Sequence, residues 1–181
     1  MKLSVCFFIL LFFISKTAGS EEAKDLFAAA MLGKVERIES LLSQGIDVNS
    51  KTANGRTPLM VASMNGNVRI VKILLGYGAD VNLTDNNGVT ALMDALVFGN
   101  EQIVSLLIMA GADVNALDAQ KNSVISRAKK AGFQQIIKML ETAGAKEPEN
   151  EPKEGEPQED KGKEPEQKKE EKPEEEKTKE K

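Results

Sequence analysis

The apolar residues in the central part of the chain follow helical spacing in short segments. Val68, Val71, Leu74 and Leu75 fall on one side of such a helix, which predicts one buried face and one solvated face. A shorter apolar segment, residues 59–62, precedes it. The pattern therefore predicts pairs of short helices that pack side by side.

The residues around these two segments supply helix starts and stops. Thr57 suits the N-cap and Pro58 the first helical position, because the hydroxyl accepts a free backbone N–H and proline has none to leave unpaired. Gly66 suits the left-handed conformation that ends a helix, and Asn67 can cap the next one. Gly78 ends the second helix, and the turn-forming residues that follow it predict a projecting hairpin loop.

The same arrangement returns at an interval of 33 residues. Four series of identical residues keep this interval: Gly33, Gly66, Gly99, Gly132; Gly45, Gly78, Gly111, Gly144; Asp47, Asp80, Asp113; and Asn49, Asn82, Asn115. A fixed period of this length indicates stacked supersecondary units. One unit cannot bury both of its faces, whereas stacked units share a continuous core. The sequence predicts an all-α repeat solenoid of about four helix-turn-helix units.

The second unit, "NGRTPLMVASMNGNVRIVKILLGYGADVN", closely resembles the repeat of the ankyrin family. The third unit matches nearly as well, and the first and fourth depart from the pattern as capping units do. Met60 and Met93 stand where the family has histidine, so the hydrogen bonds of that histidine between loops are expected to be missing. The resemblance covers roughly residues 24–145 and implies antiparallel helix pairs in a gently curved stack.

The repeats and two changes of composition divide the chain into three parts. Residues 1–19 are a predicted signal peptide, residues 20–145 the predicted ankyrin-repeat domain, and residues 146–181 a tail rich in Glu, Lys and Pro. The predicted repeats cover residues 20–51, 52–84, 85–117 and 118–145.

Residues 1–19 have the layout of a secretory signal, with Lys2, an apolar run at residues 3–14 and small residues after it. A membrane anchor is the competing interpretation, but the run is well short of the roughly 20 residues that a spanning helix needs. Cleavage after Gly19 and cleavage after Ser20 both fit. Either would remove Cys6, the only cysteine, which suits an oxidising compartment. We expect an exported protein, either periplasmic or secreted.

The tail holds 10 lysines, 15 acidic residues and 5 prolines in 36 residues, without Val, Ile, Leu, Met or an aromatic residue. Nothing there can be buried to offset the entropy of ordering, so the sequence predicts a disordered, extended segment. Its net charge is −5 (10 minus 15), whereas residues 21–145 carry 12 basic and 13 acidic residues, a net charge of −1. Without a strong basic patch, nucleic acid is not an expected partner.

The residue inventory argues against catalysis. The chain has no histidine, and its one cysteine lies in the predicted signal peptide, so the usual proton shuttle, thiol nucleophile and zinc ligands are absent. Asp47, Asp80 and Asp113 could suggest a row of calcium sites. Turn stabilisation by each aspartate and the asparagine two residues later is the simpler interpretation. We expect no enzyme activity, no cofactor and no metal.

The resemblance implies that a partner protein binds the short first helices and the hairpin tips. Positions that differ between the repeats are expected to form the contact surface, and Phe98 stands out because exposed aromatic residues often act as hot spots. The expected contact residues are Met31, Asn54, Arg56, Met64, Asn65, Asn86, Asn87, Val89, Val97, Phe98, Gln120, Asn122 and Lys130. The alternative is that these residues pack within the stack or belong to ordinary solvated loops.

Two functions from different classes follow from the sequence. The first is a monomeric module that binds another protein through the concave face and hairpin tips of the stack. The second is a structural spacer or envelope-associated protein whose extended charged tail is the functional element.

Asp94 and Arg127 are also 33 residues apart, at a position where the first two repeats have Ala28 and Val61. This spacing predicts an ion pair between the third and fourth repeats.

Overall fold

The computed structural model describes residues 21 and 23–147. The predicted signal peptide, both of its possible cleavage sites and nearly all of the predicted tail lie outside the described residues. A helix at residues 23–31 comes first. It is followed by α2 (Val35–Ser43), α3 (Pro58–Met64), α4 (Val68–Gly76), α5 (Ala91–Ala95), α6 (Glu101–Met109), α7 (Val124–Ala131) and α8 (Gln134–Thr142).

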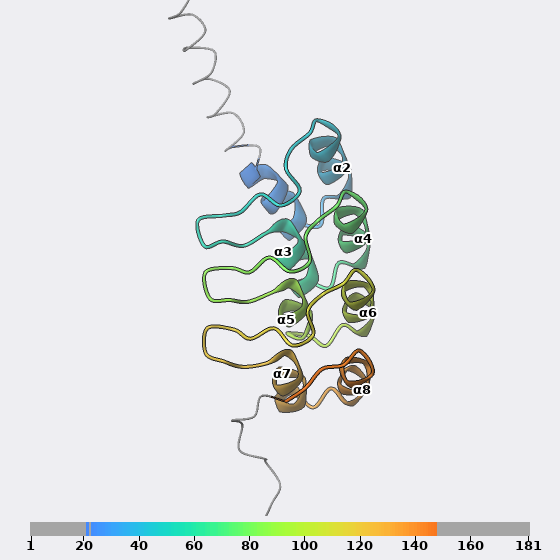
Figure 1. Cartoon of the computed structure of the whole chain (residues 1–181). Coiled ribbons are helices and arrows are strands. Elements are labelled where there is room, and N and C mark those ends of the chain that lie inside the picture. Colours follow the sequence, from blue (N-terminus) through green and yellow to red (C-terminus); the bar gives the residue numbers. More distant parts are fainter. Residues whose placement is uncertain (1–20, 22, 148–181) are drawn as a thin grey trace, which may run out of the picture. The chain divides into compact units, whose positions relative to one another are not determined.

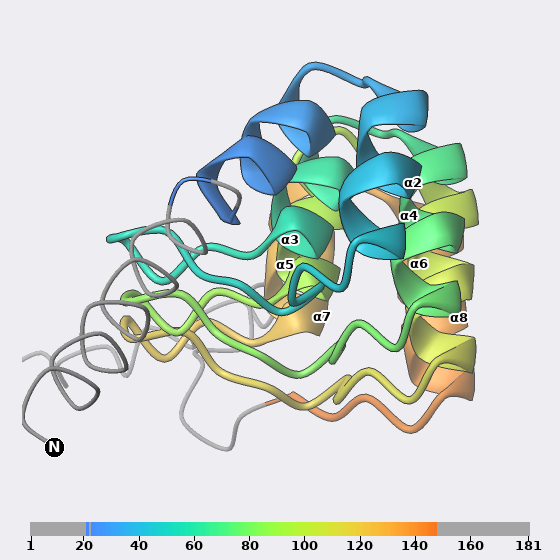
Figure 2. The ribbon, with the colours of Figure 1, turned by 90° about the horizontal axis from the view of Figure 1, so that it is seen from above.

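The helices stand in two rows (Figure 1). α3, α5 and α7 stack in the row from which the hairpin loops project, and α2, α4, α6 and α8 form the other row. We call these the inner and outer rows. Figure 2 shows successive loops lying one over another on the side away from the outer row. The surface made by the inner helices and the hairpin loops is called the inner face below. The prediction of an all-α repeat solenoid is confirmed.

The helices begin and end where the local sequence predicts. The Thr57 hydroxyl accepts a hydrogen bond from the Met60 N–H at the start of α3, and the Asn67 side chain accepts one from the Ile70 N–H at the start of α4. Gly66 lies between the two helices with a φ of +72°. A glycine is required there because this left-handed backbone strains other residues.

One hydrophobic core runs through the described repeats. It extends from Leu26 in the first helix to Leu140 in α8 without a break between repeats. Of the four residues predicted to form the apolar face of α4, Val71 and Leu74 are fully buried and Val68 and Leu75 are partly buried against the core. Ile70, which was not among them, is also fully buried. Because each helix pair contacts the next, the repeated apolar residues serve as the packing surface between successive repeats.

In the turns after the outer helices, the aspartate bonds within its own turn and the asparagine side chain bonds to the next repeat. The Asp80 carboxylate accepts the Asn82 N–H at 2.9 Å, which stabilises its own turn as predicted. The prediction that the asparagine serves the same turn is wrong. Asn82 accepts the Asp113 N–H at 2.8 Å and donates to the Gly111 carbonyl at 3.1 Å, both in the next repeat. An amide carries both a donor and an acceptor, so it can bind an N–H and a carbonyl at once, whereas an ionised carboxylate only accepts.

The hairpin loops comprise residues 52–56, 85–89 and 118–122. In each loop the N–H of the first residue donates to the carbonyl of the fifth, at 3.0–3.1 Å. Among the helices of the described residues, none combines the length and apolar character needed to cross a membrane.

Candidate protein-interaction face

The ends of the inner helices carry the most exposed apolar side chains of the inner face. Phe98 is 76% exposed, and Val97 beside it is 51% exposed. Met31, the first-repeat equivalent of Val97, is 50% exposed. Burying such side chains against a partner is favourable, so these positions are suited to contact.

The remaining predicted residues of this row have other roles. Met64 is only partly exposed and packs against the core. The Asn65 side chain donates to the Met31 carbonyl at 3.0 Å, which links the first two repeats. Lys130 is exposed, and its ammonium lies 3.4 Å from the Asn122 side-chain oxygen. The row is therefore apolar at Met31 and its neighbour Leu32, which is 64% exposed, and at Val97–Phe98, and it is basic in the last repeat.

The hairpin tips form a backbone ladder across the repeats. The Asn86 N–H donates to the Asn54 carbonyl at 3.0 Å, and the Ala119 N–H donates to the Asn87 carbonyl at 2.8 Å. The Asn86 side chain adds a bond to the Ala53 carbonyl at 3.2 Å. Asn54, Asn86, Asn87 and Gln120 are all exposed, so the tips form a rim of amide side chains on a fixed backbone.

Arg56, Val89 and Asn122 occupy equivalent positions, and all three are partly buried. Arg56 donates to the Asp94 carboxylate at 2.6 Å and lies 3.7 Å from that of Asp85. Only 23% of the Arg56 side chain is exposed, and both carboxylates are nearly inaccessible. Arg56 therefore joins the second repeat to the third, in addition to facing the surface.

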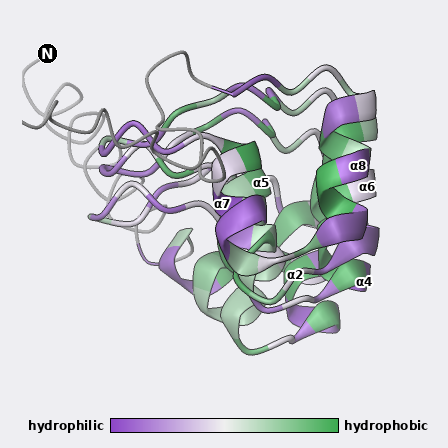
Figure 3. Cartoon of the chain, turned by 90° about the horizontal axis from the view of Figure 1, so that it is seen from below, coloured by the Kyte–Doolittle hydropathy of each residue, from purple (hydrophilic) through white to green (hydrophobic). Residues whose placement is uncertain are grey.

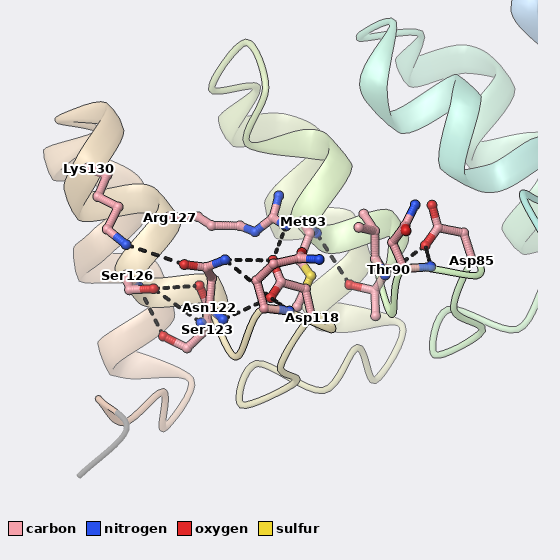
Figure 4. A network of polar contacts seen from close by, with 12 residues as sticks. Asp85, Thr90, Met93, Asp118, Asn122, Ser123, Ser126, Arg127 and Lys130 are labelled. Carbon is pink, nitrogen blue, oxygen red and sulfur yellow. Dashed lines mark hydrogen bonds and ion pairs between the residues drawn. The ribbon is translucent and has the colours of Figure 1, made fainter. Parts of the chain in front are cut away.

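The predicted ion pair between Asp94 and Arg127 does not form. Asp94 binds Arg56 instead, and Arg127 binds the buried Asp118 carboxylate within its own repeat. The hairpin of the second repeat brings Arg56 to Asp94, and the hairpin of the fourth repeat brings Asp118 to Arg127, so each of the two residues has an opposite charge from a hairpin. Figure 4 shows Arg127 meeting Asp118, which in turn contacts Asn122.

The two buried carboxyl groups respond differently to their surroundings. Burial raises the pKa of Asp94 to about 6, although the charge and hydrogen bond of Arg56 oppose the shift. Burial also acts to raise the pKa of Asp118, but hydrogen bonds from Asn122 and Arg127 outweigh it and lower that pKa. Asp118 accepts backbone and side-chain donors at once: Gln120 N, Asn122 N, Asn122 Nδ2 and Arg127.

Asp85 and Asp118 are missing from the residues expected on the sequence. Both begin a hairpin, and each accepts two backbone N–H groups of its own loop, those of Asn87 and Val89 in the case of Asp85. Two features of the sequence could have identified them: they are 33 residues apart, and the equivalent residue of the second repeat, Thr52, is not acidic. In the part of the chain that the structure describes, no cluster of three His, Cys, Asp or Glu could hold a metal ion.

The fold defines a helical repeat protein whose successive units contact only their neighbours. A family model described as ankyrin repeats (3 copies) matches residues 26–118, and the chain belongs to this family. Ankyrin repeats generally serve protein–protein interaction and are typically non-catalytic. The match covers the first three helix pairs, and α7 and α8 continue the same arrangement beyond it. No curated protein matches the chain.

Proposed function

We propose that the chain is a non-catalytic module that binds one partner protein through its inner face. The observation that carries this proposal is the exposure of Phe98, Val97 and Met31 at positions that differ from repeat to repeat. The repeated apolar positions are buried by the neighbouring repeats, so only the varying ones are left for a partner. The amide-rich hairpin tips supply a polar rim beside this apolar surface.

The proposal is tested by crosslinking the full chain to its partner in extracts of the source organism and identifying the crosslinked residues by mass spectrometry. A Met31→Glu/Phe98→Glu variant is expected to lose the partner. A Tyr77→Glu/Met109→Glu variant is the matched control, because those two side chains are also large, apolar and exposed but lie at the ends of outer helices. Equal capture by both variants would reject the inner face as the binding surface.

Function in the charged tail is the competing proposal from a different class, and residues 148–181 of the tail lie outside the described residues. A chain that ends at Glu147 separates the two. This end point is preferred to Ala145 because the Lys146 N–H donates to the Asn115 side chain at 2.8 Å and Glu147 pairs with Lys129. Loss of the partner on removal of the tail alone would assign binding to the tail.

We also propose that the protein is exported, to the periplasm or the extracellular medium. The support is the signal-like layout of residues 1–19. N-terminal sequencing of the protein from fractionated cells is expected to start at Ser20 or Glu21. A chain that retains Met1 in the cytoplasmic fraction would contradict export.

A further inference from the structure

Acidic and basic residues are sorted by depth in the inner segments of the second to fourth repeats, which comprise residues 52–65, 85–98 and 118–131. The three acidic residues of these segments, Asp85, Asp94 and Asp118, are 3–8% exposed. Every basic residue in them is at least partly exposed: Arg56, Lys121, Arg127, Lys129 and Lys130. The exposed charged groups of these segments are therefore all cationic, although the whole chain has a net charge of −4; Glu147, which lies outside the segments, pairs with Lys129.

The carboxylates hold the arginines in place from below. Asp94 and Asp85 fix Arg56, and Asp118 fixes Arg127, whose side chain remains 30% exposed. A guanidinium has five N–H donors, more than these contacts use, and its planar shape matches a carboxylate. Arginines restrained in this way lose less side-chain entropy when a further acceptor binds.

The positive surface continues around the C-terminal end of the stack. Lys129 is equivalent to Ser63 and Leu96, which are buried beneath the following repeat. Lys121 is equivalent to Gly88, where an added Cβ would meet the next hairpin. Both lysines therefore face the end of the stack. In Figure 3 α7 carries a broad hydrophilic band, whereas α5 beside it is mainly hydrophobic or neutral.

The apolar and the cationic parts adjoin each other. Lys130 is the fourth-repeat equivalent of Val97, so it follows Val97 and Phe98 by one step along the row of helix ends. A ligand that covers both needs an apolar side chain next to negative charge. A uniformly charged polyanion would leave the Phe98 side chain, 76% exposed, without a partner.

We infer that the partner contributes an acidic segment with an apolar side chain, the carboxylates near Arg127, Lys130 and Lys121 and the apolar group on Val97 and Phe98. This inference rests on the proposed function of the inner face. An acidic protein segment is favoured over single-stranded nucleic acid because bases stack on a series of aromatic side chains, whereas Phe98 is the one exposed aromatic residue of the described inner face.

The test measures binding of the full chain to a short fluorescein-labelled peptide of glutamates around one phenylalanine, by fluorescence anisotropy. We expect binding that weakens as the salt concentration rises from about 50 to about 200 mM, because exposed charges are screened. A peptide with glutamine in place of glutamate should bind at least roughly threefold more weakly at low salt. Equal affinity for the two peptides would overturn the inference.

Charge reversal locates the binding surface. Lys121→Glu/Lys130→Glu should reduce affinity for the glutamate peptide by roughly tenfold or more and raise affinity for the equivalent lysine peptide. Lys72→Glu/Lys138→Glu is the matched control, because these exposed lysines lie on the outer helices α4 and α8. Equal losses in both variants would contradict the assignment to the inner face. Circular dichroism confirms that each variant folds.

Two further outcomes separate this inference from the proposed function. If a single-stranded DNA oligonucleotide competes more strongly than the glutamate peptide, the acidic-protein inference is wrong. If Met31→Glu/Phe98→Glu abolishes capture of the natural partner but the glutamate peptide does not bind the wild type, the inner face binds a partner of different chemistry. In that case the proposed function stands and the inference fails.

Discussion

The middle and the terminal repeats share one fold but carry different residues at equivalent positions. Gly88 in the third repeat has a φ of +73°, and an added Cβ would lie 3.1 Å from the Ala119 nitrogen of the next hairpin. The equivalent residue of the fourth repeat is Lys121, which keeps a φ of +66° with a full side chain. Within the described residues no hairpin follows Lys121, so nothing collides with its side chain.

The caps of the outer helices differ in the same way. Asn67 and Asn100 accept the N–H groups that begin α4 and α6, whereas α2 and α8 begin after Lys34 and Phe133 without a side-chain cap. Phe133 packs its ring against Gly99 in place of capping. The pair Gly88 and Lys121 shows that a residue can differ where its contact with the next repeat is missing. Phe133 keeps a contact with the preceding repeat and differs from Asn67 and Asn100 in losing the cap.

The largest expected effect is at Gly88. Gly88→Ala combines left-handed backbone strain with a collision against the backbone of the next hairpin, so it should lower the free energy of unfolding by about 2–4 kcal/mol. Gly132→Ala is the control from the fourth repeat, where φ is +75° and nothing lies within 4 Å of the added Cβ. It should cost about 1–2 kcal/mol, from strain alone. Urea unfolding measures both, and equal costs would show that the contact between hairpins is unimportant.

The next effect is the pH dependence of Asp94. Its pKa is about 6 in the folded protein against 3.8 for an ordinary aspartate, so the folded state binds the proton more tightly. The stabilisation is complete below about pH 4 and is lost as the pH rises through 6, by about 1–3 kcal/mol. Asp94→Asn should remove this decline. The charged groups around Asp94 are Arg56, Asp85 and Arg127.

Asp118 in the terminal repeat supplies the opposite case. Its pKa is lowered in the folded protein, so its contribution to stability is present above the pKa of unfolded aspartate and is lost as the pH falls below it. Asp118→Asn should therefore reduce the loss of stability at acidic pH that comes from protonating Asp118. It should leave the decline in stability between pH 4 and 6 unchanged. Urea unfolding of the wild type and both variants, from below the ordinary aspartate pKa of 3.8 to above pH 6, distinguishes the two groups. A decline that persists in Asp94→Asn would contradict the assignment.

A smaller effect is expected from the asparagines that join the repeats. Asn82 makes two bonds to the next repeat, to Asp113 N and Gly111 O, whereas Asn49 makes only one, to Asp80 N. Asn82→Ala should cost about 1–2 kcal/mol and Asn49→Ala about half of that, since each bond contributes roughly 1 kcal/mol. Thermal unfolding compares the two. A larger loss of stability in Asn49→Ala than in Asn82→Ala would contradict the expectation that the middle repeats are joined more strongly than the first two.

The smallest expected effect is a gain at Lys121. Lys121→Gly relieves the left-handed strain, and the greater freedom of glycine in the unfolded chain offsets part of the gain, so stability should rise by about 0.5–1 kcal/mol. Lys146→Gly is a control at an exposed lysine outside the helices whose φ is not positive. A loss of stability in Lys121→Gly would mean that the lysine side chain makes a stabilising contact at the end of the stack.

Local patterns were sufficient to predict the architecture. Thr57, Gly66 and Asn67 act within a few residues of themselves, and the apolar face of α4 is buried as its spacing requires. Such features depend on backbone geometry and on periodicity, and both can be recognised from the sequence alone. The exposure of Phe98 could also be anticipated, since its position varies between repeats.

The polar contacts of the inner face depend on the tertiary structure. Asp94 binds Arg56, 38 residues earlier, although the repeat interval predicted Arg127 as its partner. A long side chain can meet several carboxylates at similar cost, and its choice depends on direction, burial and the other charges nearby. The sequence by itself determined the repeat, its caps and its core through local periodicity. Only the tertiary structure decided which acidic groups are buried beneath which arginines, because that depends on how the hairpins pack across the stack.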